Sequence, residues 1–218
     1  MNKIFSSSLI LAFCLGSLVS CWEENSVSEY EAFGIIEENN GKLCMRDDNE
    51  NLLVPAQSIY AFVSSGDRAW MLFTAERKPQ KAETIEVNLY DISKLHECTL
   101  QVEGTDTIGN DGIALNKLWI AQDFLTFDMM VAAFDEYTLR NHSFVIYSDM
   151  QTRNDTLYME FRHKAHGNVS RNNMLRTGAT LRLNDLQFGR TSIVLALKIT
   201  DLDEKTEIHY CRYTRKIQ

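Results

Sequence analysis

Hydrophobic and polar residues alternate along the first half of the chain in a way that predicts β-strands. In residues 84–92, Ile85, Val87 and Leu89 are separated by polar residues, which is the period-two pattern of a strand with one buried face. Turn-forming residues separate further apolar runs, and we expect strands at 30–36, 42–46, 68–77 and 97–102. About five short strands without a long helical pattern predict a small barrel of the OB type over residues 29–103.

The second half of the chain shows the same alternation at a steadier spacing. Residues 103–112 are rich in Gly, Asp and Asn, which interrupts the pattern and predicts a domain boundary. Beyond it, every second position is apolar in residues 157–161 and again in 193–199. Including these two, residues 104–218 contain seven short strand-like segments separated by turn residues, which predict an antiparallel β-sandwich. Together with the barrel, this predicts an all-β protein of two domains.

The N-terminus has the pattern of a secretory signal. Lys3 precedes an apolar segment of about a dozen residues, which is too short to span a bilayer comfortably. Residues 18–21, Leu-Val-Ser-Cys, resemble the lipobox of bacterial lipoproteins, in which the cysteine becomes the first residue and carries the lipid. We expect a signal peptide at 1–20, lipid attachment at Cys21 and a tether at 21–28. An ordinary signal peptide with an incidental cysteine is the alternative.

Charge is distributed unevenly between the two halves. The net charge of the chain is −8, and residues 22–103 hold 16 Asp and Glu against 7 Lys and Arg, while residues 104–218 hold 14 of each kind. Binding a phosphate backbone requires a basic face. The acidic first half therefore argues against a nucleic-acid partner, although OB-type barrels bind single strands in other proteins.

Three cysteines remain once the signal segment and Cys21 are set aside, namely Cys44, Cys98 and Cys211. An exported protein matures in an oxidising compartment, where disulfides form and persist. Cys44 and Cys98 fall in the same predicted domain, so a disulfide between them is one interpretation. Buried free thiols are the other interpretation.

No group of residues in the sequence forms a recognisable reaction centre. His163 and His166 in the segment HKAH would face opposite ways on a strand, and no further ligand stands at a typical spacing. Residues 47–51, DDNEN, lack the Gly and Glu that an EF-hand requires. Because no nucleophile motif is present either, we predict no enzyme activity, no metal site and no cofactor.

Two features of the sequence leave further roles open. Trp70, Trp119, Tyr137 and Tyr147 could line a platform for sugars, although strand aromatics more often belong to a core. Thr107 in the segment DTI resembles the acceptor of Bacteroidetes O-glycosylation, whose pattern is Asp, then Ser or Thr, then an apolar residue.

The order of these elements resembles the NigD-like lipoproteins of Bacteroidetes. The segments that carry the likeness are GIIEENNGKLCMRDDNENLLVP, VNLYDISKL, NKLWIAQDFLTFDMM and LYMEFRHKAHGN. The resemblance implies an OB-type domain followed by a β-sandwich, and it supplies no catalytic residues. The anchor, the two β modules and the lack of reactive clusters indicate a non-enzymatic binding lipoprotein of the bacterial outer membrane, on its periplasmic or cell-surface face. The resemblance adds a link to bacteriocin production or immunity. The partner of this lipoprotein would be a protein or a glycan. A carbohydrate-processing accessory, or an enzyme with a dispersed site, is the alternative.

Overall fold

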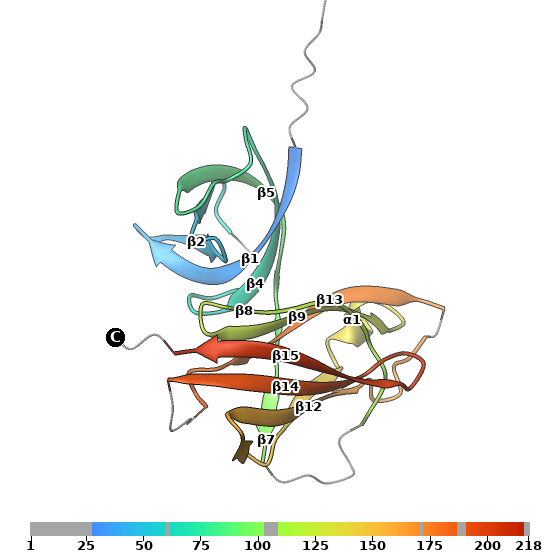
Figure 1. The fold of residues 1–218 in the computed structure, drawn as a ribbon. Coiled ribbons are helices and arrows are strands. Elements are labelled where there is room, and N and C mark those ends of the chain that lie inside the picture. Colours follow the sequence, from blue (N-terminus) through green and yellow to red (C-terminus); the bar gives the residue numbers. More distant parts are fainter. Residues whose placement is uncertain (1–27, 60–61, 103–108, 171, 187–190, 216–218) are drawn as a thin grey trace, which may run out of the picture.

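The computed structural model describes residues 28–215, apart from 60–61, 103–108, 171 and 187–190. The expected signal peptide, Cys21 and Thr107 lie outside the described residues. The described chain forms two β bodies, a barrel and a sandwich, and strand β5 (Thr84–Lys94) leads from the first into the second (Figure 1). The predicted all-β class, with a barrel followed by a sandwich, is confirmed.

The first body is a closed barrel with the strand order β1-β2-β3-β5-β4. Besides β5, its strands are β1 (Ser28–Asn39), β2 (Lys42–Asp47), β3 (Leu52–Pro55) and β4 (Arg68–Ala75). The long β1 pairs with both β2 and β4 at Gly34, where any side chain would meet the backbone oxygen of Arg46. A glycine there allows the strand to bend from one partner to the other. The barrel core includes Ile36, Met45, Leu53, Met71, Phe73 and Val87.

The second body is a sandwich of two sheets. One has the order β6-β13-β9-β8, formed by β6 (His96–Glu97), β8 (Ala114–Ala121), β9 (Phe124–Ala132) and β13 (Met174–Arg182). The other has the order β15-β14-β12-β10-β7, formed by β7 (Thr99–Gln101), β10 (Ser143–Tyr147), β12 (Thr156–Lys164), β14 (Ser192–Thr200) and β15 (Thr206–Thr214), with β11 (Thr152–Arg153) paired to β12. Three pairs, β6–β13, β7–β10 and β12–β14, are parallel, so the sandwich is mixed and not wholly antiparallel.

A short helix, α1 (Glu136–Leu139), follows β9. The carboxylate of Asp135 accepts a hydrogen bond from the Thr138 N–H and the Thr138 hydroxyl accepts one from the Asp135 N–H, which caps this single turn. Within the part of the chain that the structure describes, no helix is long and apolar enough to cross a bilayer.

The alternation in the sequence sets the inner face of the sandwich. Leu157, Met159 and Phe161 of β12 are buried, and so is the predicted row in β14, which consists of Ile193, Leu195, Leu197 and Ile199. These residues pack with β9 and β13 into a core that is separate from the barrel core. Each body therefore has the hydrophobic core of a domain of its own.

The strand expected at 97–102 belongs to the sandwich, so its assignment to the barrel was wrong. β5 continues through Leu95 into β6 and β7, which pair with β13 and β10. Cys98, between these two short strands, is buried in the sandwich core. Five strands, each with two neighbours, already close the barrel, so it is complete without residues 97–102.

Candidate functional site

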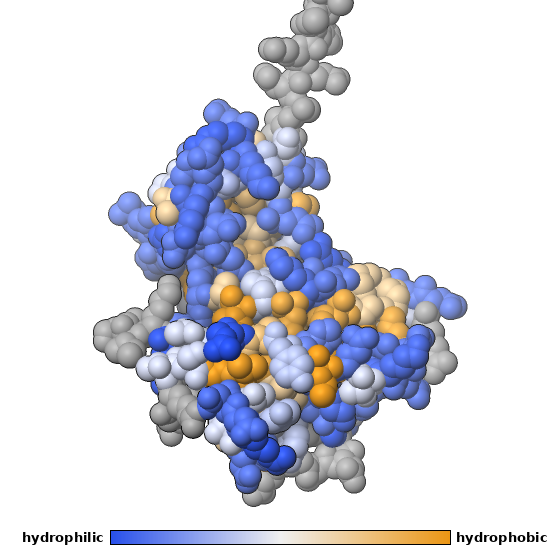
Figure 2. All heavy atoms as spheres, in the orientation of Figure 1, coloured by the Kyte–Doolittle hydropathy of each residue, from blue (hydrophilic) through white to orange (hydrophobic). Residues whose placement is uncertain are grey.

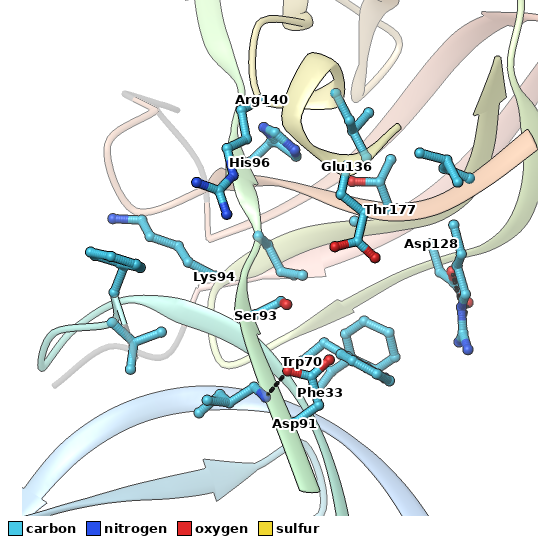
Figure 3. Close-up of a pocket in the computed structure, with 18 residues that line it drawn as sticks. Phe33, Trp70, Asp91, Ser93, Lys94, His96, Asp128, Glu136, Arg140 and Thr177 are labelled. Carbon is cyan, nitrogen blue, oxygen red and sulfur yellow. Dashed lines mark hydrogen bonds and ion pairs between the residues drawn. The ribbon is translucent and has the colours of Figure 1, made fainter. Parts of the chain in front are cut away.

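A cleft of about 730 Å³ lies between the barrel and the sandwich. Residues 91–96, at the end of β5 and in β6, form one wall, and residues 175–178 of β13 form the opposite wall. Phe33 and Trp70 line it from the barrel and α1 lines it from the sandwich (Figure 3). Phe62 also lines it and is 96% exposed, which places this ring at the rim. The volume lies within the usual range of ligand sites.

The cleft forms where β13 and the strand that runs from β5 into β6 move apart on one side of the short segment over which they pair. β6 and β13 pair in parallel over two positions. Before that point β5 stays with the barrel, paired to β4 as far as Lys94, whereas β13 stays with β9. Gly178 permits the close approach where the strands meet, since a Cβ atom there would lie 2.6 Å from Leu95 Cδ2. The cleft is the space between the two diverging strands.

Trp70 lines this cleft, and its indole donor is buried without a partner among the described residues. The residue lies on β4 and is half-buried, and its Nε1 atom is fully buried and bonded to no described residue. An unsatisfied buried donor costs about 1–3 kcal/mol. The indole of Trp119 differs, because its Nε1 donates to Asp48 Oδ2 at 2.7 Å. Because the Nε1 atom of Trp70 has almost no accessible surface, Trp70 contributes to the lining of the cleft through its ring.

Charged side chains surround the apolar residues of the cleft. Arg176 of β13 donates to two carboxylates, Asp128 of β9 and Glu31 of β1, at 2.9–3.0 Å. The hydrogen bonds to Asp128 and Glu31 raise the pKa of Arg176. The side chains of Glu136 and Arg140, at the two ends of α1, form no hydrogen bond or ion pair with the described residues. The cleft thus offers a carboxylate and a guanidinium to a partner.

A polar seam beside the cleft holds the barrel against the sandwich. The guanidinium of Arg68 donates to both carboxylate oxygens of Asp48, at 2.6 and 2.7 Å, and to Thr126 Oγ1 of β9 at 3.3 Å. The side-chain amide of Gln122 donates to the backbone oxygen of Asp47 at 2.7 Å. The bonds from Arg68 to Thr126 and from Gln122 to Asp47 cross from one body to the other. The two walls of the cleft are therefore held in place before any partner binds.

Three histidines lie close together in the sandwich. Nε2 of the buried His163 is 2.9 Å from Nδ1 of His142, and Nδ1 of His163 has no partner among the described residues. Burial, and to a smaller extent His142, lowers the pKa of His163 to about 4. His96 packs against Phe144, and burial lowers the pKa of His96 as well. The described residues contain no group of three or more His, Cys, Asp or Glu arranged around an ion site.

The disulfide considered between Cys44 and Cys98 is absent, because the two cysteines do not lie in the same domain as that interpretation required. Cys44 lies in β2 of the barrel, whereas Cys98 lies in the core of the sandwich, and both are buried free thiols. Burial raises the pKa of both thiols, which keeps them protonated and unreactive. Cys211 of β15 is a half-buried free thiol.

The aromatic residues considered for a sugar platform do not come together. Trp70 lines the cleft, Trp119 belongs to the polar seam, and Tyr137 is exposed on α1. Tyr147 lines a second hollow, of about 260 Å³, on the outer face of the sheet that contains β12, β14 and β15. The predicted set is therefore split among four places.

Two tyrosines that the sequence did not single out make this outer face aromatic. Tyr158 and Tyr210 are 46% and 65% exposed, and they flank Ala196 on neighbouring strands. The next row holds an ion pair of Lys198 with Glu160 at 3.3 Å. Both tyrosines occupy outward-facing positions in strands whose inward positions are apolar. The period-two pattern of the sequence could therefore have identified them as exposed.

Comparison with known proteins places this architecture in a family. A family profile described as the NigD-like C-terminal beta sandwich domain matches residues 96–213, more than half of the chain. The match begins at the first residue of β6, which agrees with the pairing of β6 and β7 in the sandwich. The comparison with curated protein sequences found no match.

Several solved structures share the fold at low sequence identity. A NigD-like immunity protein from Bacteroides caccae ATCC 43185 is 14% identical, with a TM-score of 0.65 over 88% of this chain and 98% of its own. A proposed toxin-related protein from Parabacteroides distasonis ATCC 8503 is 16% identical, with a TM-score of 0.65 over 86% and 94%. A proposed lipoprotein from Bacteroides fragilis NCTC 9343 is 10% identical, with a TM-score of 0.61 over 87% and 100%. Since the family profile spans the whole sandwich, the chain belongs to the NigD-like family.

Proposed function

We propose that this chain is a lipid-anchored, non-enzymatic protein of the bacterial envelope that binds a partner in the cleft between barrel and sandwich. The observation that carries the proposal is a cleft that is already formed and that is lined by apolar side chains, among them Phe33 and Trp70. The unpaired side chains of Glu136 and Arg140 supply further contacts. In the described part of the cleft no serine or cysteine is hydrogen-bonded to a base, which favours binding over catalysis.

The anchor is the part of the proposal that rests on sequence. Residues 18–21 place Cys21 at the end of an apolar signal segment, and the relative from B. fragilis is a proposed lipoprotein. A lipidated Cys21 with more than one acyl chain would hold the protein at the membrane stably. We propose the outer membrane as its location, with the folded body on the periplasmic or cell-surface face.

The class of partner that we propose rests on the named role of a relative and on the acidic charge of residues 22–103. The relative from B. caccae is named an immunity protein, and we extend that role to this chain by proposing that the cleft binds a bacteriocin or a protein involved in its production. The acidic balance of residues 22–103 argues against a nucleic acid as the partner.

Site-specific crosslinking in intact cells tests binding in the cleft. Phe62→p-benzoylphenylalanine places a photoreactive ring at the rim of the cleft, and the same change at Phe134 provides a matched control, since Phe134 is also exposed and does not line the cleft. We expect one discrete crosslinked species from Phe62 and none from Phe134. Adding Arg140→Ala should reduce its yield about tenfold, because the variant removes an unpaired guanidinium from the lining of the cleft. Equal crosslinking from both phenylalanines would refute the proposal.

Lipidation is tested on the N-terminal peptide of the purified protein. Mass spectrometry should find a chain that begins at Cys21 and carries acyl chains. Cys21→Ala should move the protein from the membrane fraction to the soluble fraction and leave its unfolding temperature unchanged, because both cores lie after residue 28. An unmodified Cys21 in membrane-bound protein would contradict the anchor.

Glycan binding on the outer face of the sandwich is the second candidate function. Tyr158 and Tyr210 present exposed rings on either side of Ala196, and Glu160 and Lys198 beside them can bond to hydroxyl groups. Exposed aromatic rings next to hydrogen-bonding side chains suit the apolar faces and hydroxyl edges of sugar rings.

Calorimetry with a panel of soluble oligosaccharides tests this second function. Tyr158→Ala combined with Tyr210→Ala should abolish binding of any oligosaccharide that the unchanged protein binds. Tyr137→Ala removes an exposed tyrosine from α1, outside this face, and should leave the affinity unchanged. No heat of binding from any member of the panel would refute the glycan function and leave binding in the cleft as the account of this protein.

A further inference from the structure

The wall of the cleft formed by β13 is an unpaired strand edge. β9 pairs with β13 over its whole length, whereas β6 pairs with the other edge of β13 at Ala179 and Thr180. Residues 174–177 therefore present one edge that has no partner strand among the described residues, over about 13 Å. An edge of this kind accepts a further strand unless side chains or a covering segment block it.

The direction of the backbone groups along this edge follows from a bond at its paired end. The N–H of Cys98 donates to the oxygen of Thr180 at 2.7 Å, so the polar backbone groups of Thr180 point away from β9. The register between β13 and β9 is regular, and the backbone groups of an antiparallel strand alternate in direction. The N–H and C=O groups of Arg176 and Met174 therefore also point away from β9, at Arg176 into the cleft that this residue lines and at Met174 just beyond its end.

The opposite wall is a strand edge that a side chain already blocks in part. β4 pairs with one edge of β5 at Asp91–Lys94, and β3 pairs with the other edge only at residues 84–87. At this second edge the N–H of Ile92 donates to Asp91 Oδ1 at 2.8 Å, as Figure 3 shows. A carboxylate on an edge donor hinders strand pairing, so β13 is the edge that remains open.

We infer that an extended polypeptide segment of a partner adds to the sandwich as a strand alongside residues 174–177 of β13. This inference rests on the proposed function and states which kind of partner the cleft takes. An extended backbone is the ligand that offers alternating donors and acceptors at the spacing of such an edge. The protein itself shows that the edge accepts a strand, because β6 already pairs with it two residues further on.

The side chains around the edge define the segment that fits. Leu139 and Leu175 lie on the sandwich side of the cleft, and Phe33 and Trp70 lie on the barrel side. Apolar surface is also seen on the sandwich near its junction with the barrel (Figure 2). Four or five residues span the edge at about 3.3 Å each. The segment therefore carries apolar side chains that pack against these residues.

A backbone-specific test uses the mature full-length chain with Cys21→Ala and a display library of random heptapeptides as the probe. Selected peptides are synthesised with a single N-methyl group at each backbone nitrogen in turn, and each dissociation constant is measured. N-methylation at alternate residues should weaken binding about tenfold, and at the intervening residues it should have little effect, because every second N–H faces the neighbouring strand. If N-methylation weakens binding without alternating along the peptide, the inference is overturned. It is also overturned if the display library yields no peptide that binds.

A matched pair of variants tests the same edge from the side of the protein. Met174→Pro removes the N–H that points away from β9 at the end of this edge and leaves the ladder with β9 intact, whereas Met174→Ala keeps the N–H. Peptide affinity should fall about fivefold or more for the proline variant relative to the alanine variant. Circular dichroism checks that both variants are folded. If the proline variant does not fold, the N-methylated peptides measured against the unchanged protein provide the test instead. Equal affinity of two folded variants would refute strand addition.

The failure of this inference can be told apart from the failure of the proposed function. If Phe62 crosslinks to a partner in cells and Met174→Pro leaves that crosslink unchanged, the cleft binds a partner by its side chains and not by strand addition. If the crosslink is lost with the proline variant and retained with the alanine variant, the partner enters as a strand. If Phe62 gives no crosslink, binding in the cleft itself is refuted.

Discussion

Arg68 and Trp70 project from the same face of β4 toward the sandwich, because Ala69 and Met71 next to them fill the barrel core. Arg68 uses its donors on Asp48 and Thr126, which joins the two bodies. Trp70 lines the cleft beside that joint and leaves its buried donor without a partner among the described residues. The sequence indicates the face that these residues share, but it does not indicate which of them finds a partner, because those partners come from distant segments.

Arg68→Ala should lower the free energy of unfolding by about 3 kcal/mol, because it leaves a largely buried carboxylate without its cation. Urea unfolding followed by circular dichroism measures this change. Arg77→Ala is the matched control, since Arg77 also holds a carboxylate, Glu83, through two hydrogen bonds but at the surface. The control should leave the stability nearly unchanged. Equal effects of the two variants would contradict the role of Arg68 at the joint.

The buried His163 should make the protein sensitive to acid. Its pKa falls from the ordinary 6.5 to about 4 in the folded protein, so between these values the unfolded chain binds the proton more readily than the folded chain. Stability is then at its full value above pH 6.5 and decreases as the pH falls toward 4, by at most about 3 kcal/mol.

Thermal unfolding measured across that pH interval checks the role of His163. His163→Phe should flatten the decrease in stability, whereas His209→Phe, a change at a less buried histidine on β15, should leave it as it is. An unchanged acid dependence in His163→Phe would assign the effect to other groups.

Among the elements, regular alternation predicted the strands that face a core and did not predict the strands that build the cleft. The rows in β12 and β14 are buried as expected. The first half of β13, residues 174–178, carries no clear period-two pattern, because Arg176 and Gly178 break the alternation. β6 and β7 were assigned to the barrel because strands of two or three residues carry no sign of their partners.

The sandwich should fold alone when β6 and β7 are included. These strands are the edges of its two sheets, and Cys98 between them fills the core. A chain of residues 95–218 should therefore unfold in a single cooperative transition, whereas a chain of residues 104–218 should unfold at a lower temperature or lack a transition. Differential scanning calorimetry of both chains decides this. Equal stability would show that β6 and β7 contribute little to the sandwich.

At the scale of the whole molecule, the order of barrel and sandwich was predictable, and the cleft between them was not. The order follows from strand patterns within each half. The cleft depends on contacts between residues more than 50 positions apart, such as Arg68 with Thr126 and Gln122 with Asp47. Phe33, Phe62 and Arg176, which line it, stand in unrelated segments. No local pattern in one sequence reports such an arrangement.

The indole signals of the tryptophans in a nitrogen-15 spectrum test binding in the cleft most directly. Trp70 and Trp119 report on the cleft and on the polar seam, and Trp119 already donates to Asp48. When the partner captured through Phe62 is added, the indole signal of Trp70 should shift because its ring lines the cleft, while that of Trp119 should stay unchanged. A saturated complex in which the Trp70 signal does not move would contradict binding in the cleft.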